Sequence, residues 1–329
     1  MEERKSDHIK LAFKSQTSIN ELDKRFYYEP VLAAHPNKPL PEISFAKKTI
    51  VSPLWASSMT GGTALANRIN HNIARACNEF KMGMGLGSCR GLLDSDTYLK
   101  DFDLRPIIGN DLPFYANLGI AQIEQLIIEN KLFKITNLLE KLQADGLIIH
   151  INPLQEWIQP EGDKYYIPPI DAIEAVLSQL NIRIIVKEVG QGMGFESLKR
   201  LLNLPLDAIE LAGFGGTNFS LLEIFRNHPN QQDTYMPFAL VGHDLEQMIE
   251  FTNLLANENN RKCHQLIISG GIKNYLDGYY FIQKSKIPAI YAQASGILKY
   301  AKESYDDLRD YIQSQIDGYR LASNLLKIR

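Results

Sequence analysis

The sequence predicts an α/β protein with the fold of a (β/α)8 TIM barrel and an N-terminal extension. Short apolar runs rich in β-branched residues alternate with longer segments of helical period, which is typical of βα units wound into a parallel sheet. Eight such runs remain after the weakest is set aside, and 329 residues can form one closed ring of eight strands. Each run ends in glycine or in reactive polar residues, as in barrel enzymes, whose sites lie at the carboxyl ends of the strands. A doubly wound open sheet also predicts the alternation, but the strand count and the polar strand ends favour the barrel.

The expected elements follow from these patterns. Nine segments qualify as strands, in chain order 50–57, 82–87, 114–118, 147–152, 182–188, 208–212, 238–241, 266–269 and 289–294. The weakest is 238–241, because it follows Pro237 and a stretch with loop composition, and we expect it to be a connection before the seventh helix. Helical period is clearest in residues 64–80, 170–180 and 196–204, where apolar residues recur at intervals of three and four.

The chain reads as a single domain with an N-terminal arm. We expect residues 1–48 to form the arm and residues 49–329 to form the barrel. The arm has charges but no apolar run suited to a secretory signal, and its end, residues 33–43, is extended and marked by prolines. No stretch of about 18 consecutive apolar residues occurs, so we expect a protein with no membrane segment, located in the cytoplasm.

The composition argues against several kinds of partner. The 35 basic and 38 acidic residues leave a net charge of -3, which gives no broad positive surface for nucleic acid or anionic lipid. The three cysteines are odd in number and lack metal-like spacing, so neither a disulfide framework nor a zinc site is indicated. A small-molecule ligand in a reducing compartment fits these counts best.

Two glycine-rich strand ends are candidates for binding a phosphate. Gly215, Gly216 and Thr217 follow the sixth strand, and Gly270 and Gly271 follow the seventh. Glycine lets the backbone approach a ligand closely and leaves its N–H groups free to point at phosphate oxygens. Tight turns after strands are the alternative for either pair, but two pairs at neighbouring strand ends favour the phosphate.

The fifth strand ends in "VKEVGQGMG", which contains three glycines and a lysine. Its glycines at 190, 192 and 194 are similar to a dinucleotide-binding turn, but the spacing is G-x-G-x-G and the unit is the fifth rather than the first. We therefore disfavour a Rossmann site. Lys187 is more informative, because a lysine at the inner end of a buried strand needs an anion or an acceptor beside it. A salt bridge to Glu188 or to a neighbouring residue is the alternative.

The end of the fourth strand, "HINPLQE", concentrates polar residues. Alternation places His150 and Asn152 on one side of the strand, and the following loop then projects Gln155 and Glu156 above the barrel mouth. A lone glutamate at the rim suits Mg2+, which takes one or two carboxylates and keeps water or substrate phosphate as its other ligands. A solvated loop glutamate is the alternative.

The amino terminus carries a second basic group. Arg4 and Lys5 are adjacent, with Asp7 and His8 close by. An Arg–Lys pair can hold a phosphate, the arginine by its planar fork and the lysine as a point charge. A frayed basic terminus is the alternative.

Taken together, these motifs resemble the type II isopentenyl diphosphate isomerases, which are flavin-dependent barrel enzymes of isoprenoid biosynthesis. The matching segments, in family order from Arg4 to about Leu298, are "RKSDH", "MTGG", "GSCR", "HINPLQE", "VKEVG", "GFGGTN" and "SGGIK". The specific part is "HINPLQE" together with the amino-terminal "RK", because the glycine signatures are shared with other FMN barrels.

The resemblance implies a function and its cofactors. The expected reaction is the interconversion of isopentenyl diphosphate and dimethylallyl diphosphate by proton addition and elimination, with reduced FMN and Mg2+ bound and no net redox change. NADH or NADPH would supply the electrons that keep the flavin reduced. The resemblance also implies a homo-oligomer, a tetramer or larger.

The resemblance also implies residue roles. Gln155 and Lys187 would be catalytic, with Gln155 near the reacting carbons and Lys187 at the pyrimidine end of the flavin, and Glu156 would hold Mg2+. The residues expected to bind substrate are Arg4, Lys5, His8, Ser88, Arg90, His150, Asn152 and Gln155. The residues expected to bind FMN are Met59, Thr60, Gly61, Ser88, Asn117, Lys187, Thr217, Gly270, Gly271, Lys273, Ala294 and Ser295.

Three positions depart from the family pattern. Cys89 stands where the family usually has glutamine, which removes the polar contact that this glutamine would make near flavin and substrate. Lys273 stands where arginine is usual, which keeps the charge but loses the bidentate geometry. The last motif, "AQASGIL", which contains the expected FMN contact Ser295, lacks the arginine often found there.

Two other functions remain open on the sequence. An FMN-dependent oxidoreductase acting on a small substrate would use the same glycine-rich loops. Against it, "GFGGTN" lacks the nucleophilic cysteine of the related nucleotide dehydrogenases, and "SGGIK" is not preceded by the histidine of the hydroxy-acid oxidases. A flavoprotein without turnover is a third possibility, and only Cys89 suggests it.

Overall fold

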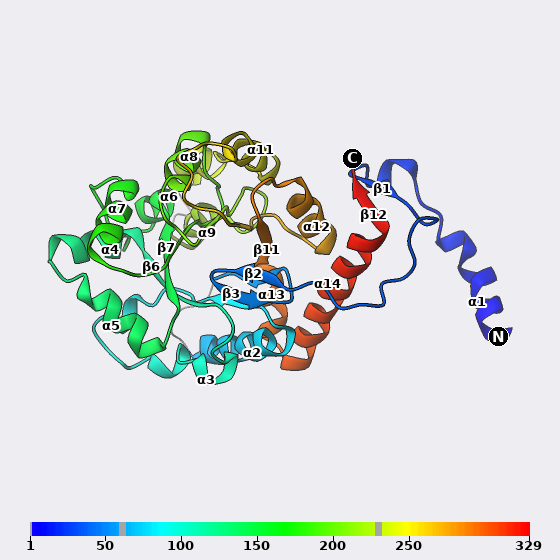
Figure 1. Cartoon of the computed structure of the whole chain (residues 1–329), viewed down its shortest axis with the longest axis horizontal. Coiled ribbons are helices and arrows are strands. Elements are labelled where there is room, and N and C mark those ends of the chain that lie inside the picture. The colour runs from blue at the N-terminus through cyan, green and yellow to red at the C-terminus, as the bar shows by residue number, and fades with distance from the viewer. Residues whose placement is uncertain (1, 59–63, 228–231) are drawn as a thin grey trace.

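The eight expected strands form a closed parallel barrel in a computed structural model that describes residues 2–58, 64–227 and 232–329. Around the ring, the order is β10, β11, β4, β5, β6, β7, β8 and β9. These strands are β4 (Leu54–Ala56), β5 (Gly83–Gly85), β6 (Phe114–Gly119), β7 (Gly146–Ile151), β8 (Ile184–Glu188), β9 (Ala208–Glu210), β10 (Leu266–Ile268) and β11 (Ala289–Gln293). Helices surround the outside of the barrel (Figure 1). Most residues of the strands are buried, because these helices cover one face of the sheet and side chains fill the inside of the barrel. The predicted fold class is confirmed.

The helices follow the strands as expected for βα units. They are α2 (Ala64–Phe80), α3 (Arg105–Ile108), α4 (Ile120–Ile128), α5 (Phe133–Leu142), α6 (Pro153–Ile158), α7 (Pro169–Gln179), α8 (Phe195–Leu202), α9 (Phe219–Asn227), α10 (Gln232–Ala239), α11 (Leu245–Leu255), α12 (Tyr275–Lys284), α13 (Ser295–Ala301) and α14 (Tyr305–Leu325). Side-chain caps begin several of them: Asp244 accepts from the N–H of Gln247 at 2.8 Å, and Ser304 accepts from the N–H of Asp307 at 3.1 Å. The segment 238–241 lies at and after the end of α10, so its exclusion from the barrel is confirmed.

A β-hairpin closes the amino-terminal end of the barrel. It consists of β2 (Ile43–Phe45) and β3 (Lys48–Ile50) and therefore spans the boundary expected between arm and barrel. The ring of Phe45 packs on Trp55 in the barrel interior, with centroids 5.6 Å apart. The backbone N–H of Ala46 donates to Gln265 at 2.9 Å, and Arg183 donates to the carbonyl of Ala46. Because this end is plugged, the opposite end of the barrel is the one left for a ligand.

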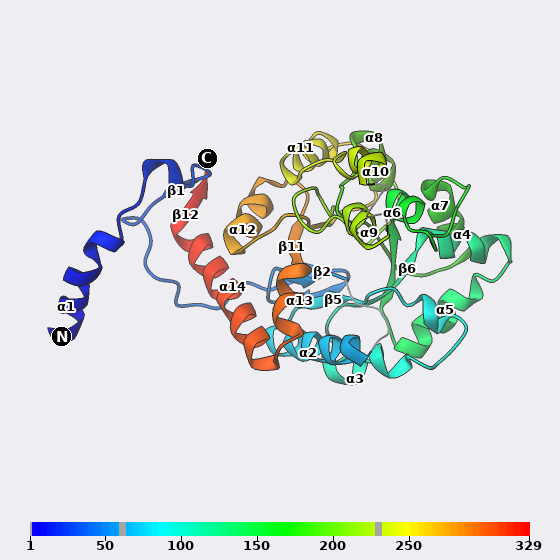
Figure 2. The same cartoon turned by 180° about the vertical axis from the view of Figure 1, so that it is seen from behind.

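The amino-terminal arm lies apart from the barrel mouth. Helix α1 (Glu2–Leu11) projects beyond α14 in both views (Figures 1 and 2), while β1 (Phe26–Tyr28) pairs with β12 (Leu326–Ile328). Apolar side chains in this arm are largely exposed, 74% for Ile9 and 83% for Phe13. Among the helices of the described chain, none has the length and apolar character to cross a bilayer.

Candidate active site

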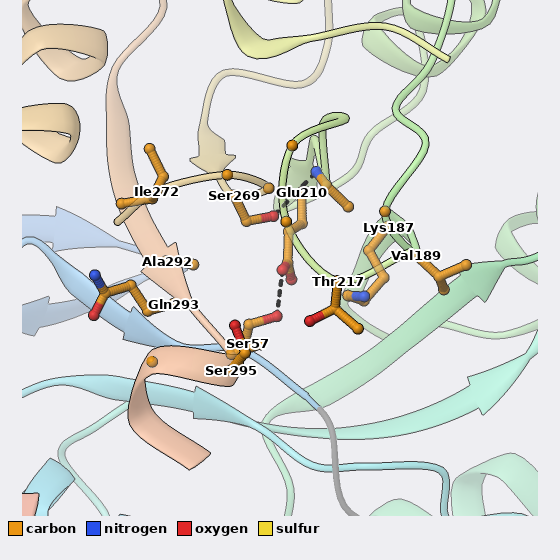
Figure 3. Close-up of a pocket in the computed structure, with 18 of the residues that line it drawn as sticks. Ser57, Lys187, Val189, Glu210, Thr217, Ser269, Ile272, Ala292, Gln293 and Ser295 are labelled. Atoms are coloured by element: carbon orange, nitrogen blue, oxygen red, sulfur yellow. Dashed lines mark hydrogen bonds between the residues drawn. The ribbon is translucent and has the colours of Figure 1, made fainter. Parts of the chain in front are cut away.

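Two adjoining pockets open at the carboxyl end of the barrel. The larger, of about 330 Å³, lies over the ends of β8 to β11 and β4 (Figure 3), and the smaller, of about 170 Å³, lies over the ends of β5 to β8. Four residues line both of them: Ser58, Lys187, Val189 and Phe219. The larger pocket brings together the predicted residues Lys187, Thr217, Gly270, Gly271, Lys273, Ala294 and Ser295. The smaller brings together Ser88, Asn117, His150, Gln155 and Lys187.

The glycine-rich loops of the larger pocket interlock. Gly215, Gly270 and Gly271 have φ of +118°, +96° and +73°, a conformation that side chains rarely adopt. A Cβ at Gly216 would lie 2.8 Å from the backbone nitrogen of Gly271, so the two loops touch through their backbones. Ser269 fixes the strand ends beneath them, because its hydroxyl accepts from the N–H of Ala212 at 3.0 Å. The result is a glycine-lined rim that suits an anion.

Lys187 stands between the two pockets as a buried cation. It is 6% exposed at the end of β8, and its Nζ donates to the backbone carbonyl of Glu188 at 2.9 Å. The expected alternative, a salt bridge to Glu188, is not formed. The carboxylate of Glu188 instead accepts from the N–H groups of Gly190, Gln191 and Gly192. The G-x-G-x-G segment is therefore a turn held by Glu188, and Lys187 has no ion pair within the described part of the chain.

His150 is held as a neutral ring in one tautomer. Its Nδ1 lies 2.8 Å from Oδ1 of Asn117, whose own amide nitrogen donates to the carbonyl of Leu86 at 3.0 Å. Since that Oδ1 can only accept, the Nδ1 of His150 carries the proton and its Nε2 presents a lone pair. Burial, together with the nearby charge of Lys187, lowers the pKa of His150 to about 3.

The polar residues after β7 form a connected group on α6. Asn152 donates through Nδ2 to Oε1 of Gln155 at 3.1 Å and to Oε1 of Glu156 at 3.0 Å. The other oxygen of Glu156 accepts from the backbone N–H of Asp163 at 2.8 Å. Glu156 is thus oriented by its neighbours and is not the freely solvated glutamate of the alternative. Asn152 does not line the smaller pocket, but it lines a neighbouring cavity of about 300 Å³ together with Gln155.

Other predicted residues lie elsewhere. Arg4, Lys5 and His8 are on α1 and line neither pocket, so their substrate contacts stay predictions. Arg90 forms an ion pair with Asp163 at 2.5 Å. The thiol of Cys89 is buried against the carbonyl of Gly87 and does not line either pocket. The expected flavin contacts Met59, Thr60 and Gly61 fall outside the described residues.

The structure adds polar residues that the sequence reasoning missed. Ser57 donates a hydrogen bond to Glu210 at the floor of the larger pocket (Figure 3). Ser58 has a buried hydroxyl without a partner in the described chain. A polar residue within the apolar run "AIELA" was the available signal for Glu210, because the inside of a buried strand normally carries apolar side chains.

Sequence relatives cover nearly the whole chain. The isopentenyl-diphosphate delta-isomerase of Rickettsia africae (strain ESF-5) is 31% identical over 334 residues, 97% of this chain and 92% of the relative. That of Legionella pneumophila is 35% identical over 286 residues, 84% of this chain and 80% of the relative. No family model matches the chain.

Solved structures share the fold at low identity. A mandelate oxidase variant with an FMN adduct has a TM-score of 0.61 at 12% identity, covering 93% of this chain and 88% of that one. A flavocytochrome b2 variant with pyruvate bound has a TM-score of 0.62 at 14% identity, covering 96% and 78%. At such identities the likeness concerns the barrel itself.

The barrel and the polar pockets at the carboxyl ends of its strands define the chain as a (β/α)8-barrel enzyme. Its relatives narrow the class further. The chain belongs to the isopentenyl-diphosphate delta-isomerase family. The family expected from the motifs is confirmed.

We predict that His150 makes the protein less stable in acid. The unfolded chain protonates this histidine below pH 6.5, but the folded chain does so only near pH 3, so stability is complete above pH 6.5 and falls as the pH is lowered. The loss should be about 1.6 kcal/mol between pH 6.5 and pH 5, measured by urea unfolding. His150→Gln should lack this part of the pH dependence, and replacing the exposed His35 by glutamine should retain it. Equal slopes for wild type and His150→Gln would contradict the assignment.

Proposed function

We propose that the protein interconverts isopentenyl and dimethylallyl diphosphates, with reduced FMN in the larger pocket and the substrate in the smaller. The observation that carries this proposal is the arrangement of the two pockets about Lys187. A glycine-lined anion site lies on one side of that cation, and His150 and Gln155 lie on the other. The names of the relatives support the reaction, and the FMN of the mandelate oxidase structure supports the cofactor.

The larger pocket fits FMN in several respects. A Cβ at Gly190 would lie 2.1 Å from the carbonyl oxygen of Thr217, so only glycine allows this loop to border the pocket. The hydroxyl of Ser58 and one carboxylate oxygen of Glu210 are buried at its floor without partners in the described chain, and a polar ligand would satisfy them. The residues that would hold the phosphate are Thr217, Gly270, Gly271, Lys273, Ala294 and Ser295.

The protein residues supply charge and position. When bound, reduced FMN would supply proton transfer to and from the substrate carbons without net electron transfer. The ammonium of Lys187 stabilises negative charge in the larger pocket, and a buried site strengthens this effect. Gln155, whose side chain is held by Asn152, orients the hydrocarbon end of the substrate. Val189 and Phe219 border both pockets and shield the alkene from water.

The diphosphate would lie beside Ser88, Arg90, His150 and Asn152. In its observed tautomer His150 offers only a lone pair at Nε2, which repels a phosphate oxygen. The negative charge of a bound diphosphate favours the imidazolium form, in which both ring nitrogens donate. His150 is therefore a group whose protonation follows the substrate.

Glu156 fits Mg2+ in a particular way. Its oxygens already accept from Asn152 and from the N–H of Asp163, but a carboxylate has further lone pairs to offer. No cluster of three or more acidic, histidine or cysteine side chains suited to a metal exists among the described residues. One carboxylate with water and substrate phosphate as the remaining ligands is the arrangement that Mg2+ accepts.

The arm and the assembly belong to the same proposal. We assign Arg4, Lys5 and His8 to the diphosphate of a substrate-bound state, in a homo-oligomer of four or more copies. The exposed apolar side chains Ile9 and Phe13 support this assignment, because an isolated short helix is barely stable in water and needs a surface on which to pack. Reduction by NADH or NADPH and a cytoplasmic location complete the proposal.

The decisive assay is anaerobic. Purified protein with FMN, dithionite and Mg2+ should convert isopentenyl diphosphate into dimethylallyl diphosphate, followed by NMR of the products. It should not consume reductant as turnover proceeds. Absence of conversion, with stoichiometric reduction of the oxidised flavin by a small hydroxy acid, would instead establish the oxidoreductase.

Replacing Glu156 should separate metal binding from flavin binding. Glu156→Gln should retain FMN affinity but lose more than about 100-fold in kcat/KM, because a neutral amide is a poor ligand for Mg2+. Glu161→Gln is a matched control, since Glu161 is exposed nearby and pairs with Arg226. The control should keep wild-type activity. Near-normal turnover of Glu156→Gln would refute the metal assignment.

Substitutions in the arm should change substrate binding and leave FMN binding unchanged. Arg4→Ala and Lys5→Ala should each raise KM for isopentenyl diphosphate about tenfold, because each removes a charge-assisted hydrogen bond to phosphate. FMN affinity and the thermal midpoint should stay unchanged. Lys14→Ala, in the same exposed arm, serves as the control for nonspecific charge effects. A KM unaffected by Arg4 and Lys5 would exclude the arm from the site.

A further inference from the structure

Glu210 is a buried carboxylate with one oxygen unused. It ends β9, is 1% exposed and lines the larger pocket. Its Oε1 accepts from the hydroxyl of Ser57, which follows β4 across the barrel (Figure 3). Its Oε2 is buried and has no hydrogen-bond partner within the described residues. This carboxylate forms part of the pocket floor, and the proposed function does not say which group of a ligand meets it.

Leaving that oxygen unsatisfied is costly. A buried carboxylate is destabilised unless donors or cations meet it, and a single hydroxyl meets only one side of the group. Lys187 is aligned with Glu210 in the pairing of β8 with β9, but its Nζ is directed to the carbonyl of Glu188 and forms no ion pair with Glu210. A donor from a ligand in the pocket would complete the set.

The chemistry of FMN limits what that donor can be. The phosphate is an anion, and the carbonyl oxygens of the ring are acceptors, so a carboxylate repels both. The remaining donors are the hydroxyls of the ribityl chain and the ring N–H groups. One of the glycine-rich loops, which contains Gly270 and Gly271, directly follows the neighbouring strand β10. Lys187 lies on the other side of Glu210, on β8. A group between the phosphate and the ring therefore lies nearest to Glu210, and that group is the ribityl chain.

We propose that Glu210 accepts a hydrogen bond from a ribityl hydroxyl of FMN, while Ser57 holds the carboxylate in position. This inference rests on the proposed function, since it takes FMN as the occupant of the larger pocket. Among the described residues that line this pocket, Glu210 is the only carboxylate, and the other lining side chains are neutral or basic. Glu210 thus favours the hydroxyl-bearing ribityl chain, whereas the rest of the pocket favours the phosphate.

The test is a binding cycle with altered flavins. Dissociation constants are measured by quenching of flavin fluorescence for FMN, for three FMN analogues each lacking one ribityl hydroxyl, and for N3-methyl FMN. Glu210→Gln should bind FMN about tenfold more weakly than wild type does. One of the deoxy analogues should bind the wild-type protein about tenfold more weakly than FMN does. Glu210→Gln should cause no further decrease in the affinity for that analogue. The other two deoxy analogues should remain sensitive to the substitution.

Controls separate this contact from a structural role. Glu124→Gln removes another buried carboxylate, which accepts from the N–H groups of Tyr166 and Ile167 far from the pocket, and should leave all ratios of affinity unchanged. Ser57→Ala keeps the carboxylate and should reduce FMN affinity by less than Glu210→Gln does, with the same pattern among the analogues. It is the variant to measure if Glu210→Gln does not fold.

The outcomes are distinct. The role of Glu210 would be overturned if Glu210→Gln weakened the binding of every flavin equally, or weakened none. It would also be overturned if N3-methyl FMN were the one flavin whose affinity the substitution left unchanged, because the contact would then lie on the ring. Each of these results leaves the proposed function standing, because FMN still binds. Failure of wild type to bind FMN at all would overturn the proposed function itself.

Discussion

The candidate site depends on one constraint, which is the burial of the Lys187 ammonium with no ion-paired carboxylate among the described residues. A buried cation normally pairs with an anion, and Glu188 is adjacent in sequence. The carboxylate of Glu188 is occupied by three backbone N–H groups of the following turn. Burial raises the pKa of Glu188, while those N–H groups and the Lys187 charge oppose the rise. The positive charge of Lys187 is therefore left to act on the two pockets.

That charge organises its surroundings. It lowers the pKa of His150 further than burial alone does, and so keeps the ring neutral while the pocket contains no anion. The turn held by Glu188 places Gly190 against the carbonyl of Thr217. The geometry of the glycine-rich rim thus follows from the hydrogen bonds of Glu188 to the turn. The neutral state of His150 follows in part from the charge of Lys187.

The parts of this arrangement that could be predicted from sequence are those with a local signal. The barrel strands were predicted because burial on both faces leaves continuous apolar runs, and the glycine-rich ends because positive φ favours glycine. Ser57 and Glu210 come from strands on different sides of the barrel, and no periodicity reports a contact across its interior. The position of the arm was equally inaccessible, because a sequence does not reveal on which surface a short helix packs.

The charge balance of the smaller pocket explains why groups from outside it are required. A diphosphate carries several negative charges, but of the described residues lining this pocket only Lys187 is a cation. His150 is neutral until an anion arrives, and Arg90 is paired with Asp163, whose N–H in turn holds Glu156. Under the proposed function, the missing positive charge would come with the substrate as Mg2+, from the basic arm, or from release of Arg90 by Asp163. Because Asp163 contacts both Arg90 and the metal candidate Glu156, movement of this one aspartate would free a cation and a carboxylate together.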